Sequence, residues 1–289
     1  MTSSTLRLTR TPALDAPQHF LLEGIAEQPF GGRQFGILTD ACNNPMCSCK
    51  EVYLFVFPDA QMEADNCAFT AHADIGTHTA KGGNDEPDSQ EAARLLGQYL
   101  SPDDWVALGN TWRGIKAAQI EDLTPKTAAA LEFDFAADLS VMEEFAAVFP
   151  HCLRLNIVRD GTALTTFDQY CVNPKCACTD VMLDFFKENQ PKQPVFSILY
   201  DYRTGQVNGS QTIGIRAAEA TAFITAIKNT TWPELDDWLA RRNKILRAMR
   251  QNYPRHPVAN TRRKLMATFA RNAVCSCGSG KKYKHCCGK

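Results

Sequence analysis

The sequence predicts an α+β fold in which one unit of strands, a cysteine motif and helices occurs twice, before a small cysteine-rich module at the C-terminus. Three observations predict this organisation. The phrase CNNPMCSC at residues 42–49 returns as CVNPKCAC at residues 171–178. Each phrase is followed by two segments with the alternation of strands and then by two with helical periodicity. A third, different cysteine cluster lies within residues 275–287.

The segments that follow each cysteine phrase have apolar side chains at alternate positions, as half-buried strands do. In the first copy they are KEVYLFVF at residues 50–57 and FTAHADIGT at residues 69–77. In the second copy they are TDVMLDFF at residues 179–186 and FSILYDYRT at residues 196–204. We therefore expect two strands after each phrase.

Two helices are expected after the strands of each copy. The first copy has EAARLLGQYL and SPDDWVALGNTW, and the second has IRAAEATAFITAI and TWPELDDWLARRNKIL. Ser101 is the expected N-cap of its helix, because a proline follows it and Asp104 stands at the third helical position. Thr231 and Glu234 have the spacing of a capping box.

These patterns divide the chain into four parts. We expect a first α+β repeat at residues 15–122 and a second at residues 146–253. Connecting helices are expected at residues 123–145, and a basic tail module at residues 254–289. The N-terminus has no apolar signal region, and no apolar run approaches the roughly 18 residues of a membrane span. We therefore expect a cytoplasmic protein.

Ten of the 12 cysteines fall into three groups, and only Cys67 and Cys152 stand apart. In the reducing cytosol, clustered cysteines hold metal more often than they form disulfides. The three groups are Cys42, Cys47 and Cys49; Cys171, Cys176 and Cys178; and Cys275, Cys277, Cys286 and Cys287.

Each internal group supplies three thiolates. If a strand begins near the second cysteine, Cys47 and Cys49 share a face, and the Asn-Pro turn brings Cys42 back beside them. Structural zinc takes four ligands in a tetrahedron, so one ligand is open. The candidates are Glu51 and Asp180, Asp74 and Asp201, Cys67 and Cys152, or a site shared by the two copies. Three cysteines with an open position also suit a redox or catalytic site, and buried reduced thiols are the third interpretation.

Charge is distributed unevenly along the chain. Residues 241–289 contain 14 Lys and Arg and no Asp or Glu, whereas residues 1–240 contain 17 basic and all 32 acidic residues. Such asymmetry predicts that the tail meets a polyanion, such as RNA phosphates, or an acidic protein surface. Contact between the tail and the acidic body of the chain itself is the alternative.

The terminal cluster CSCGSGKKYKHCC places four thiols within residues 275–287. Gly278 and Gly280 allow the backbone to turn sharply after the first pair. So small a module has little core, so zinc binding would supply its folding energy, about 10–16 kcal/mol for peptide-sized sites. GSGK at residues 278–281 is not a phosphate-binding loop, because Cys275 stands where that loop needs its first glycine. No nucleotide cofactor is expected.

This cluster resembles the SEC-C motif, a zinc knuckle that ends the bacterial SecA preprotein translocase ATPase and many otherwise unrelated bacterial proteins. The resemblance covers residues 275–287 alone. It implies Zn²⁺ bound by Cys275, Cys277, Cys286 and Cys287. It also implies an interaction module, since the SecA knuckle contacts an export chaperone and ribosomes. It implies no ATPase, because the nucleotide motifs of the motor do not occur here.

The sequence therefore predicts a zinc-binding accessory or adaptor protein whose basic SEC-C tail docks on a ribosome, a chaperone or another acidic surface. The alternative is a metal- or thiol-dependent enzyme that uses the duplicated cysteine sites. No residue is assigned a catalytic role, because the sequence offers no convincing acid–base pair.

Overall fold

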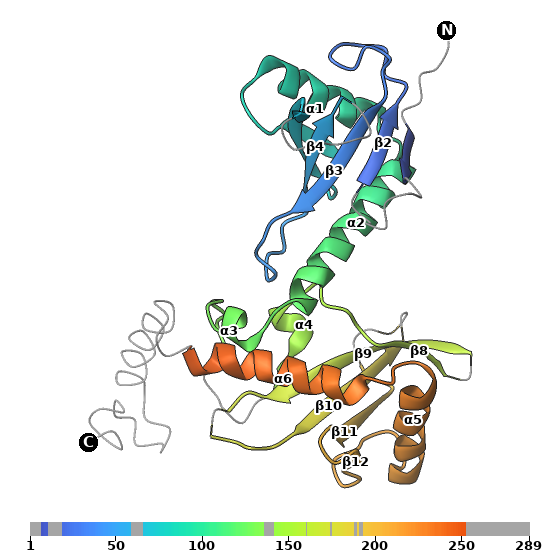
Figure 1. The fold of residues 1–289 in the computed structure, drawn as a ribbon. Helices are drawn as coiled ribbons and strands as arrows, with labels where there is room; N and C mark the ends of the chain where they lie inside the picture. The colour runs from blue at the N-terminus through green and yellow to red at the C-terminus, as the bar shows by residue number, and fades with distance from the viewer. Residues whose placement is uncertain are drawn as a thin grey trace, which may run out of the picture. The chain divides into compact units, whose positions relative to one another are not determined.

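The structure is a computed structural model that describes residues 7–10, 19–58, 66–135, 142–159, 161–173, 175–187, 190 and 193–252 (Figure 1). The chain divides into two compact units. The first contains Met1–Asp122 and Phe149–Leu153, and the second contains Leu123–Val148 and Arg154–Lys289. Each unit combines an antiparallel sheet with helices, which confirms the α+β class. The predicted tail, with its zinc knuckle, lies outside the described residues, and the predicted domain boundaries stay predictions.

The first unit contains a six-stranded antiparallel sheet in which each strand pairs with the next along the chain. Strand β4 buries Val52, Leu54 and Val56 on one face, as its alternation predicts. The strands are β1 (Arg7–Arg10), β2 (His19–Glu23), β3 (Phe35–Ala41), β4 (Glu51–Phe57), β5 (Phe69–Asp74) and β6 (Thr79–Gly82).

Two helices cover the buried face of this sheet, where α1 (Pro87–Tyr99) packs on β5 and β6 and α2 (Pro102–Glu121) packs on β3 (Figure 1). The predicted cap of α2 is confirmed. The amide of Asp104 donates to Ser101 Oγ at 3.2 Å, and the amide of Ser101 donates to Asp104 Oδ2 at 2.9 Å. This reciprocal pair satisfies two amide groups that the first turn would otherwise leave open.

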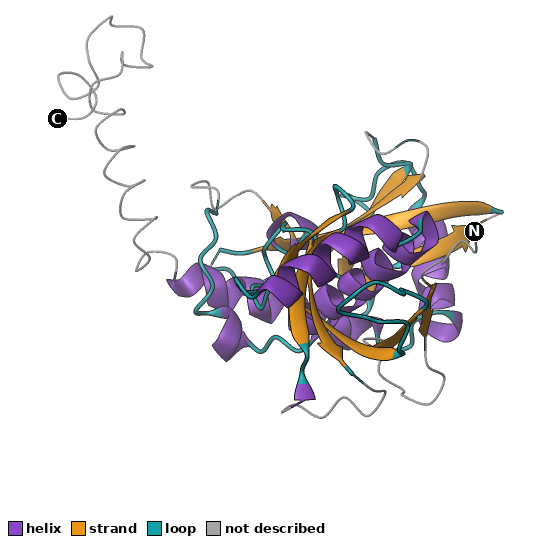
Figure 2. Cartoon of the chain, turned by 90° about the horizontal axis from the view of Figure 1, so that it is seen from above, coloured by secondary structure: helices purple, strands orange, loops and turns teal. Residues whose placement is uncertain are grey.

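The second unit contains another antiparallel sheet, in the order β12-β11-β10-β9-β7, with β8 also paired to β9. Its strands are β7 (Met142–Glu144), β8 (Asn156–Arg159), β9 (Thr162–Cys171), β10 (Asp180–Lys187), β11 (Phe196–Asp201) and β12 (Gln206–Val207). Its helices are α3 (Pro125–Ala128), α4 (Phe145–Val148), α5 (Ala217–Thr230) and α6 (Leu235–Asn252), and α3 packs on α6. Figure 1 labels these helices, and Figure 2 shows the helices and strands of the chain from a second direction.

The predicted capping box at Thr231 and Glu234 is wrong. Thr231 ends α5, because its amide donates to the Ile227 carbonyl at 2.9 Å and its backbone stays in the helical region. An N-cap residue needs an extended backbone, so Thr231 cannot start the next helix. The helix α6 begins only at Leu235, and the amide of Trp238 bonds to the Glu234 carbonyl at 3.0 Å.

A buried ion pair joins α6 to β9 in the second unit. Arg242 Nη1 lies 3.0 Å from both carboxylate oxygens of Asp168, and the two side chains are 1% and 4% exposed. The Tyr170 hydroxyl donates to Asp168 at 2.7 Å. The guanidinium also lies over the rings of Trp238 and Phe145, at 3.6 and 4.2 Å from their centroids. These contacts fix the helix over the strand that ends at Cys171.

The two units share their order of elements around the cysteine phrases. In each, a strand leads into the phrase, a hairpin of two strands follows, a short strand pairs with the second, and two helices complete the unit. The hairpin registers also agree, since Glu51 pairs with Asp74 and Asp180 pairs with Asp201.

The turn after the second hairpin strand is built alike in both units. Asp74 Oδ1 accepts the amides of Gly76 and Thr77 at 2.7 and 3.1 Å, and Asp201 Oδ1 accepts the amides two and three residues on at 2.8 and 3.3 Å. Each turn ends in a left-handed residue, His78 at φ 57° and Gly205 at φ 72°. His78 tolerates this conformation while its ring stacks on Trp105 at 5.2 Å.

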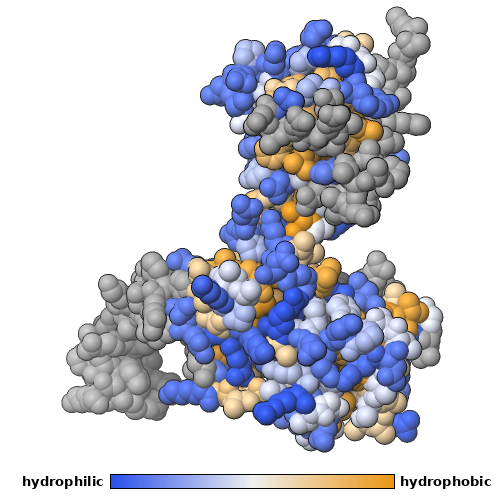
Figure 3. Space-filling view, in the orientation of Figure 1, coloured by the Kyte–Doolittle hydropathy of each residue, from blue (hydrophilic) through white to orange (hydrophobic). Residues whose placement is uncertain are grey.

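Hydrophilic side chains predominate on the visible face of the second unit (Figure 3). Figure 3 shows small apolar patches among hydrophilic side chains on the visible face of the second unit. The most exposed large apolar residues are Val158 and Ile213, at 74% and 67%. No described helix combines the length and the apolar character that crossing a membrane requires.

Candidate metal centre

Each internal cysteine phrase forms the connection of a β-hairpin. The first joins β3, which ends at Ala41, to β4, which begins at Glu51, and the second joins β9 to β10. The expectation that Cys47 and Cys49 lie on a strand is wrong, because neither belongs to β4. The loop itself, and not strand alternation, brings the cysteines together.

An Asn-Pro turn shapes the first loop. The amide of Cys47 donates to the Asn44 carbonyl at 3.0 Å, and the amide of Met46 donates to Asn44 Oδ1 at 3.0 Å. Proline suits the second position of such a turn because its φ is already close to the required value. The amides of Asn44 and Cys49 point at sulfur, 3.4 Å from Cys42 Sγ and 3.3 Å from Cys47 Sγ.

The second loop repeats three of these four contacts. The amide of Cys176 donates to the Asn173 carbonyl at 3.0 Å, and the amide of Lys175 donates to Asn173 Oδ1 at 3.0 Å. The amide of Cys178 lies 3.5 Å from Cys176 Sγ. Because amide donors stabilise sulfur that carries negative charge, these contacts favour the thiolate form of Cys47 and Cys176.

The turns gather three sulfur atoms in each loop. Within each triplet the Sγ atoms lie within 4.8 Å of one another, and every one of the six cysteines is half-buried. Sulfur atoms that share one zinc ion at ~2.3 Å lie about 3.8 Å apart, so the spacing fits a common metal ion. That they bind a metal ion stays a prediction. The triplets are Cys42, Cys47 and Cys49, and Cys171, Cys176 and Cys178.

Without a metal ion, the thiols of one loop have different proton affinities. Hydrogen bonds from the side chain and backbone of Cys49 lower the pKa of Cys47, whereas burial raises the pKa of Cys49 to about 11. In the second loop the backbone amide of Cys178 lowers the pKa of Cys176, and burial raises the pKa of Cys178 to about 12. A divalent ion would have to displace the protons of the high-pKa thiols.

A cation from the last helix of each unit holds the cysteine loop. The Lys116 side chain on α2 is fully buried, and its ammonium donates to the carbonyls of Cys42 and Asn44 at 2.5 and 2.8 Å. In the second unit, Arg247 on α6 donates to the carbonyls of Cys176 and Cys178 at 2.6 and 2.8 Å, and its Nη2 lies 3.8 Å from Cys178 Sγ. Both cations thus lie beside a triplet of thiols.

Sequence reasoning missed both cations. Their contact with the loops spans about 70 residues, and no local spacing indicates it. The only available signal was a long helix that carries Lys or Arg among its buried positions in each copy.

Three of the four carboxylates proposed as fourth ligands have other partners. Glu51 pairs with Lys81 at 2.9 Å, and Asp74 accepts the two turn amides described above. Asp201 accepts the Thr179 hydroxyl at 2.7 Å in addition to its turn amides. Among the described residues, neither these carboxylates nor that of Asp180 joins a sulfur triplet within 4.8 Å.

The two isolated cysteines also lie apart from the triplets. Cys67 precedes β5, whose residue Phe69 pairs with Val56 near the end of β4. The first loop adjoins the opposite end of that hairpin, about 17 Å away at ~3.3 Å per residue. Cys152 is buried in the Phe149–Leu153 segment and joins no triplet among the described residues.

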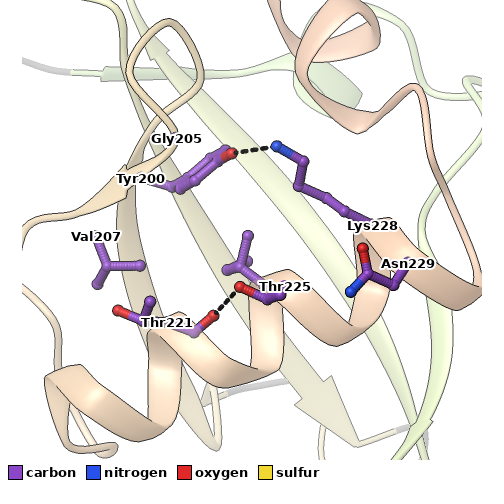
Figure 4. Close-up of a pocket in the computed structure, with 8 residues that line it drawn as sticks. Tyr200, Gly205, Val207, Thr221, Thr225, Lys228 and Asn229 are labelled. Carbon is purple, nitrogen blue, oxygen red and sulfur yellow. Dashed lines mark hydrogen bonds between the residues drawn. The ribbon is translucent and has the colours of Figure 1, made fainter.

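A small cavity of about 220 Å³ lies between α5 and the β11–β12 hairpin of the second unit (Figure 4). Several of its polar groups bond to one another or to Asp236. Tyr200 donates to Asp236 Oδ1 at 2.5 Å, and Lys228 lies 3.4 Å from the Tyr200 hydroxyl and pairs with Asp236. Thr225 donates to the Thr221 carbonyl at 2.9 Å. The cavity contains none of the described cysteines.

Comparison with known proteins identifies the end of the chain. Residues 271–289 match the SEC-C motif, which confirms the resemblance found in the sequence. No curated protein and no solved structure gives a significant match to the chain. The body is therefore interpreted from its own residues, and the SEC-C match with the cysteine triplets points to metal binding.

Proposed function

We propose that the chain is a cytoplasmic accessory or adaptor protein that binds one Zn²⁺ at each internal cysteine triplet and a third in its SEC-C knuckle. The convergence of three sulfur atoms in each hairpin loop carries this proposal. A reducing compartment suits it, because thiols remain free there. Thiolate donors favour zinc or another soft ion over Mg²⁺ or Ca²⁺, which prefer oxygen.

We also propose that the two units are copies of one ancestral unit. The common order of elements supports this, as do the equal hairpin registers and the paired turns that end at His78 and Gly205. The loops themselves share the Asn-Pro turn and its amide–sulfur contacts. One design of metal loop would then serve both sites.

The basic tail is the proposed docking element. Residues 254–289 carry nine cationic side chains and no acidic one, and the SEC-C motif ends the segment. Contacts of such a tail with RNA phosphates on a ribosome, with a chaperone or with another acidic surface would weaken as salt rises. The zinc at each body site would then be structural.

Metal analysis of the purified full-length protein tests the zinc proposal. We expect three zinc ions per chain, and two after serine replaces the three cysteines of either internal triplet. Less than one zinc per chain would refute the proposal.

A pulldown tests the docking role of the tail. The partners bound by the full-length protein are compared with those bound by a variant that lacks residues 254–289, and both sets are analysed for ribosomal RNA and proteins. An unchanged set of bound partners would refute the role of the tail.

A metal- or thiol-dependent enzyme is the second candidate. The lowered pKa of Cys47 and of Cys176, in half-buried loops, favours it, because thiolates are the reactive form of cysteine. Alkylation of the native protein separates the two functions. Fast labelling of the zinc-loaded loops supports the enzyme, whereas protection until a chelator is added supports structural zinc.

A further inference from the structure

We propose that each internal triplet holds its metal ion with one coordination position left for a thiolate from outside the chain. The inference rests on the metal binding proposed above. A tetrahedral zinc ion has four ligand positions, and the described part of each loop supplies sulfur donors for three of them. The inference concerns the fourth position.

The engagement of three of the four candidate carboxylates supports an outside ligand. Glu51 would have to leave the ammonium of Lys81, and Asp74 would have to give up two backbone amides that hold the hairpin turn. Asp201 accepts the hydroxyls of Thr179 and Thr204 and two amides of its own turn. Moving Asp74 or Asp201 to the metal would break the backbone hydrogen bonds that hold the hairpin turns.

The exposure of the sulfur atoms allows a ligand to reach the metal. All six cysteines are half-buried, although a typical structural zinc site is closed by four protein ligands. A small molecule, or a cysteine on a protruding segment of another chain, can therefore approach the open corner.

The cation on the last helix of each unit offsets the negative charge that a fourth thiolate would add at the metal. Zn²⁺ with three thiolates has a net charge of −1, and a fourth thiolate would raise this to −2. The Lys116 ammonium lies 2.5 Å from the Cys42 carbonyl oxygen, and so within about 7 Å of that residue's sulfur. Arg247 reaches closer, at 3.8 Å from Cys178 Sγ. Each cation returns the total to −1.

The chemistry of the donor set selects a thiolate over other anions. Soft sulfur ligands are the ones that bind zinc most firmly beside existing thiolates, whereas carboxylate oxygen suits harder ions. The outside ligand is thus a thiol that releases its proton to solvent as its sulfur binds the metal. No bond other than sulfur–hydrogen is broken, and no electron is transferred.

Cobalt spectroscopy of the full-length protein tests the proposal. Serine replaces Cys275, Cys277, Cys286 and Cys287, so that only the internal sites take Co²⁺, and β-mercaptoethanol is then titrated in. We expect the sulfur-to-cobalt absorption to rise and saturate at one added thiolate per internal site. A spectrum that is already typical of four thiolates, or that does not respond to thiol, would overturn the inference. Failure to bind Co²⁺ at all would instead refute metal binding itself.

Light scattering separates the two sources of thiolate. A metal-loaded protein that stays monomeric and takes up the small thiol has a position for a free thiol. A protein that dimerises with metal, and returns to monomer when the small thiol is added, takes the thiolate from a second copy. A dimer that persists in thiol would count against an open position.

Substitution of the cations tests the charge argument. With the second triplet replaced by serine, Lys116→Met should weaken thiol binding at the first site about tenfold, since one nearby charge is lost. Lys116→Arg should restore it. Arg113→Met is the matched control, because Arg113 lies on the same helix as Lys116 and is exposed. Equal effects of Lys116→Met and Arg113→Met would refute the role of the buried cation.

The second unit supplies an independent variant in case Lys116→Met fails to fold. With the first triplet replaced by serine, Arg247→Met should weaken thiol binding at the second site by a similar factor. Lys244→Met, on the same helix and exposed, is its control. Unchanged thiol affinity in Arg247→Met would overturn the charge argument for that site.

Discussion

Removal of the Asp168 carboxylate should destabilise the second unit severely. Asp168→Ala leaves Arg242 buried without the carboxylate that now lies 3.0 Å from its Nη1, and leaves the Tyr170 hydroxyl without its acceptor at 2.7 Å. Breaking a buried pair by removing one partner costs about 3–5 kcal/mol. The contacts of Arg242 with Trp238 and Phe145 would remain and keep the cost within that range.

Urea unfolding of the full-length protein, followed by circular dichroism, measures this loss. Glu91→Ala is the control, because its pair with Arg94 is exposed at 44% and 57% and should contribute below about 0.5 kcal/mol. The double variant Asp168→Ala with Arg242→Met should recover part of the stability, since no buried charge is left unpaired. A loss below about 1 kcal/mol in Asp168→Ala would show that water reaches the guanidinium and that the burial argument is wrong.

Three further predictions concern the cap, the metal loops and their pH dependence. Ser101→Ala should lower the free energy of unfolding by about 1 kcal/mol in a denaturant titration, because the Asp104 amide loses its acceptor. Asn44→Ala should weaken metal binding at the first site about tenfold in a chelator competition, while the second site serves as internal control. Lowering the pH should release metal, because protons compete with the metal ion for the thiolates. A zinc-sensitive dye measures the released metal. Uptake of metal on acidification would contradict thiolate ligation.

The sequence was sufficient for the elements that local patterns determine. Alternation predicted β4 and β10, and the Ser-Pro-Asp-Asp start predicted the cap of α2, because these features depend on neighbours within a few residues. The cysteine spacing also predicted that three thiols of each loop converge. The Asn-Pro turn that brings them together is local as well.

The remaining features depend on contacts between distant segments. The capping box at Thr231 failed because α5 extends far enough to use that residue's amide, which a local motif cannot indicate. The sequence also did not indicate the partners of Glu51 and Asp201, because Lys81 and Thr179 contact them only after the sheets form. Their engagement is what removes them as ligand candidates.

The two loop cations occupy different positions on their helices. When the acidic turns before Trp105 and Trp238 are aligned, Arg247 corresponds to Gly114, and Lys116 corresponds to Met249. Copies of one unit would retain a merely inherited cation at one position. On the proposed duplication, a cation that changes position and still holds the loop carbonyls is what we expect if the loop itself requires positive charge.

That requirement can be tested by moving the cation. Lys116→Met should weaken metal binding at the first site, and adding Gly114→Arg should restore most of the affinity, because it recreates the arrangement of the second unit. Space for the new side chain exists, since nothing lies within 4 Å of a Cβ built at Gly114. Adding Gly114→Gln in place of Gly114→Arg is the matched control, with a long polar side chain and no charge. Chelator competition measures each affinity, and equal rescue by Gln and Arg would mean that hydrogen bonding to the carbonyls, and not charge, is what the loop needs.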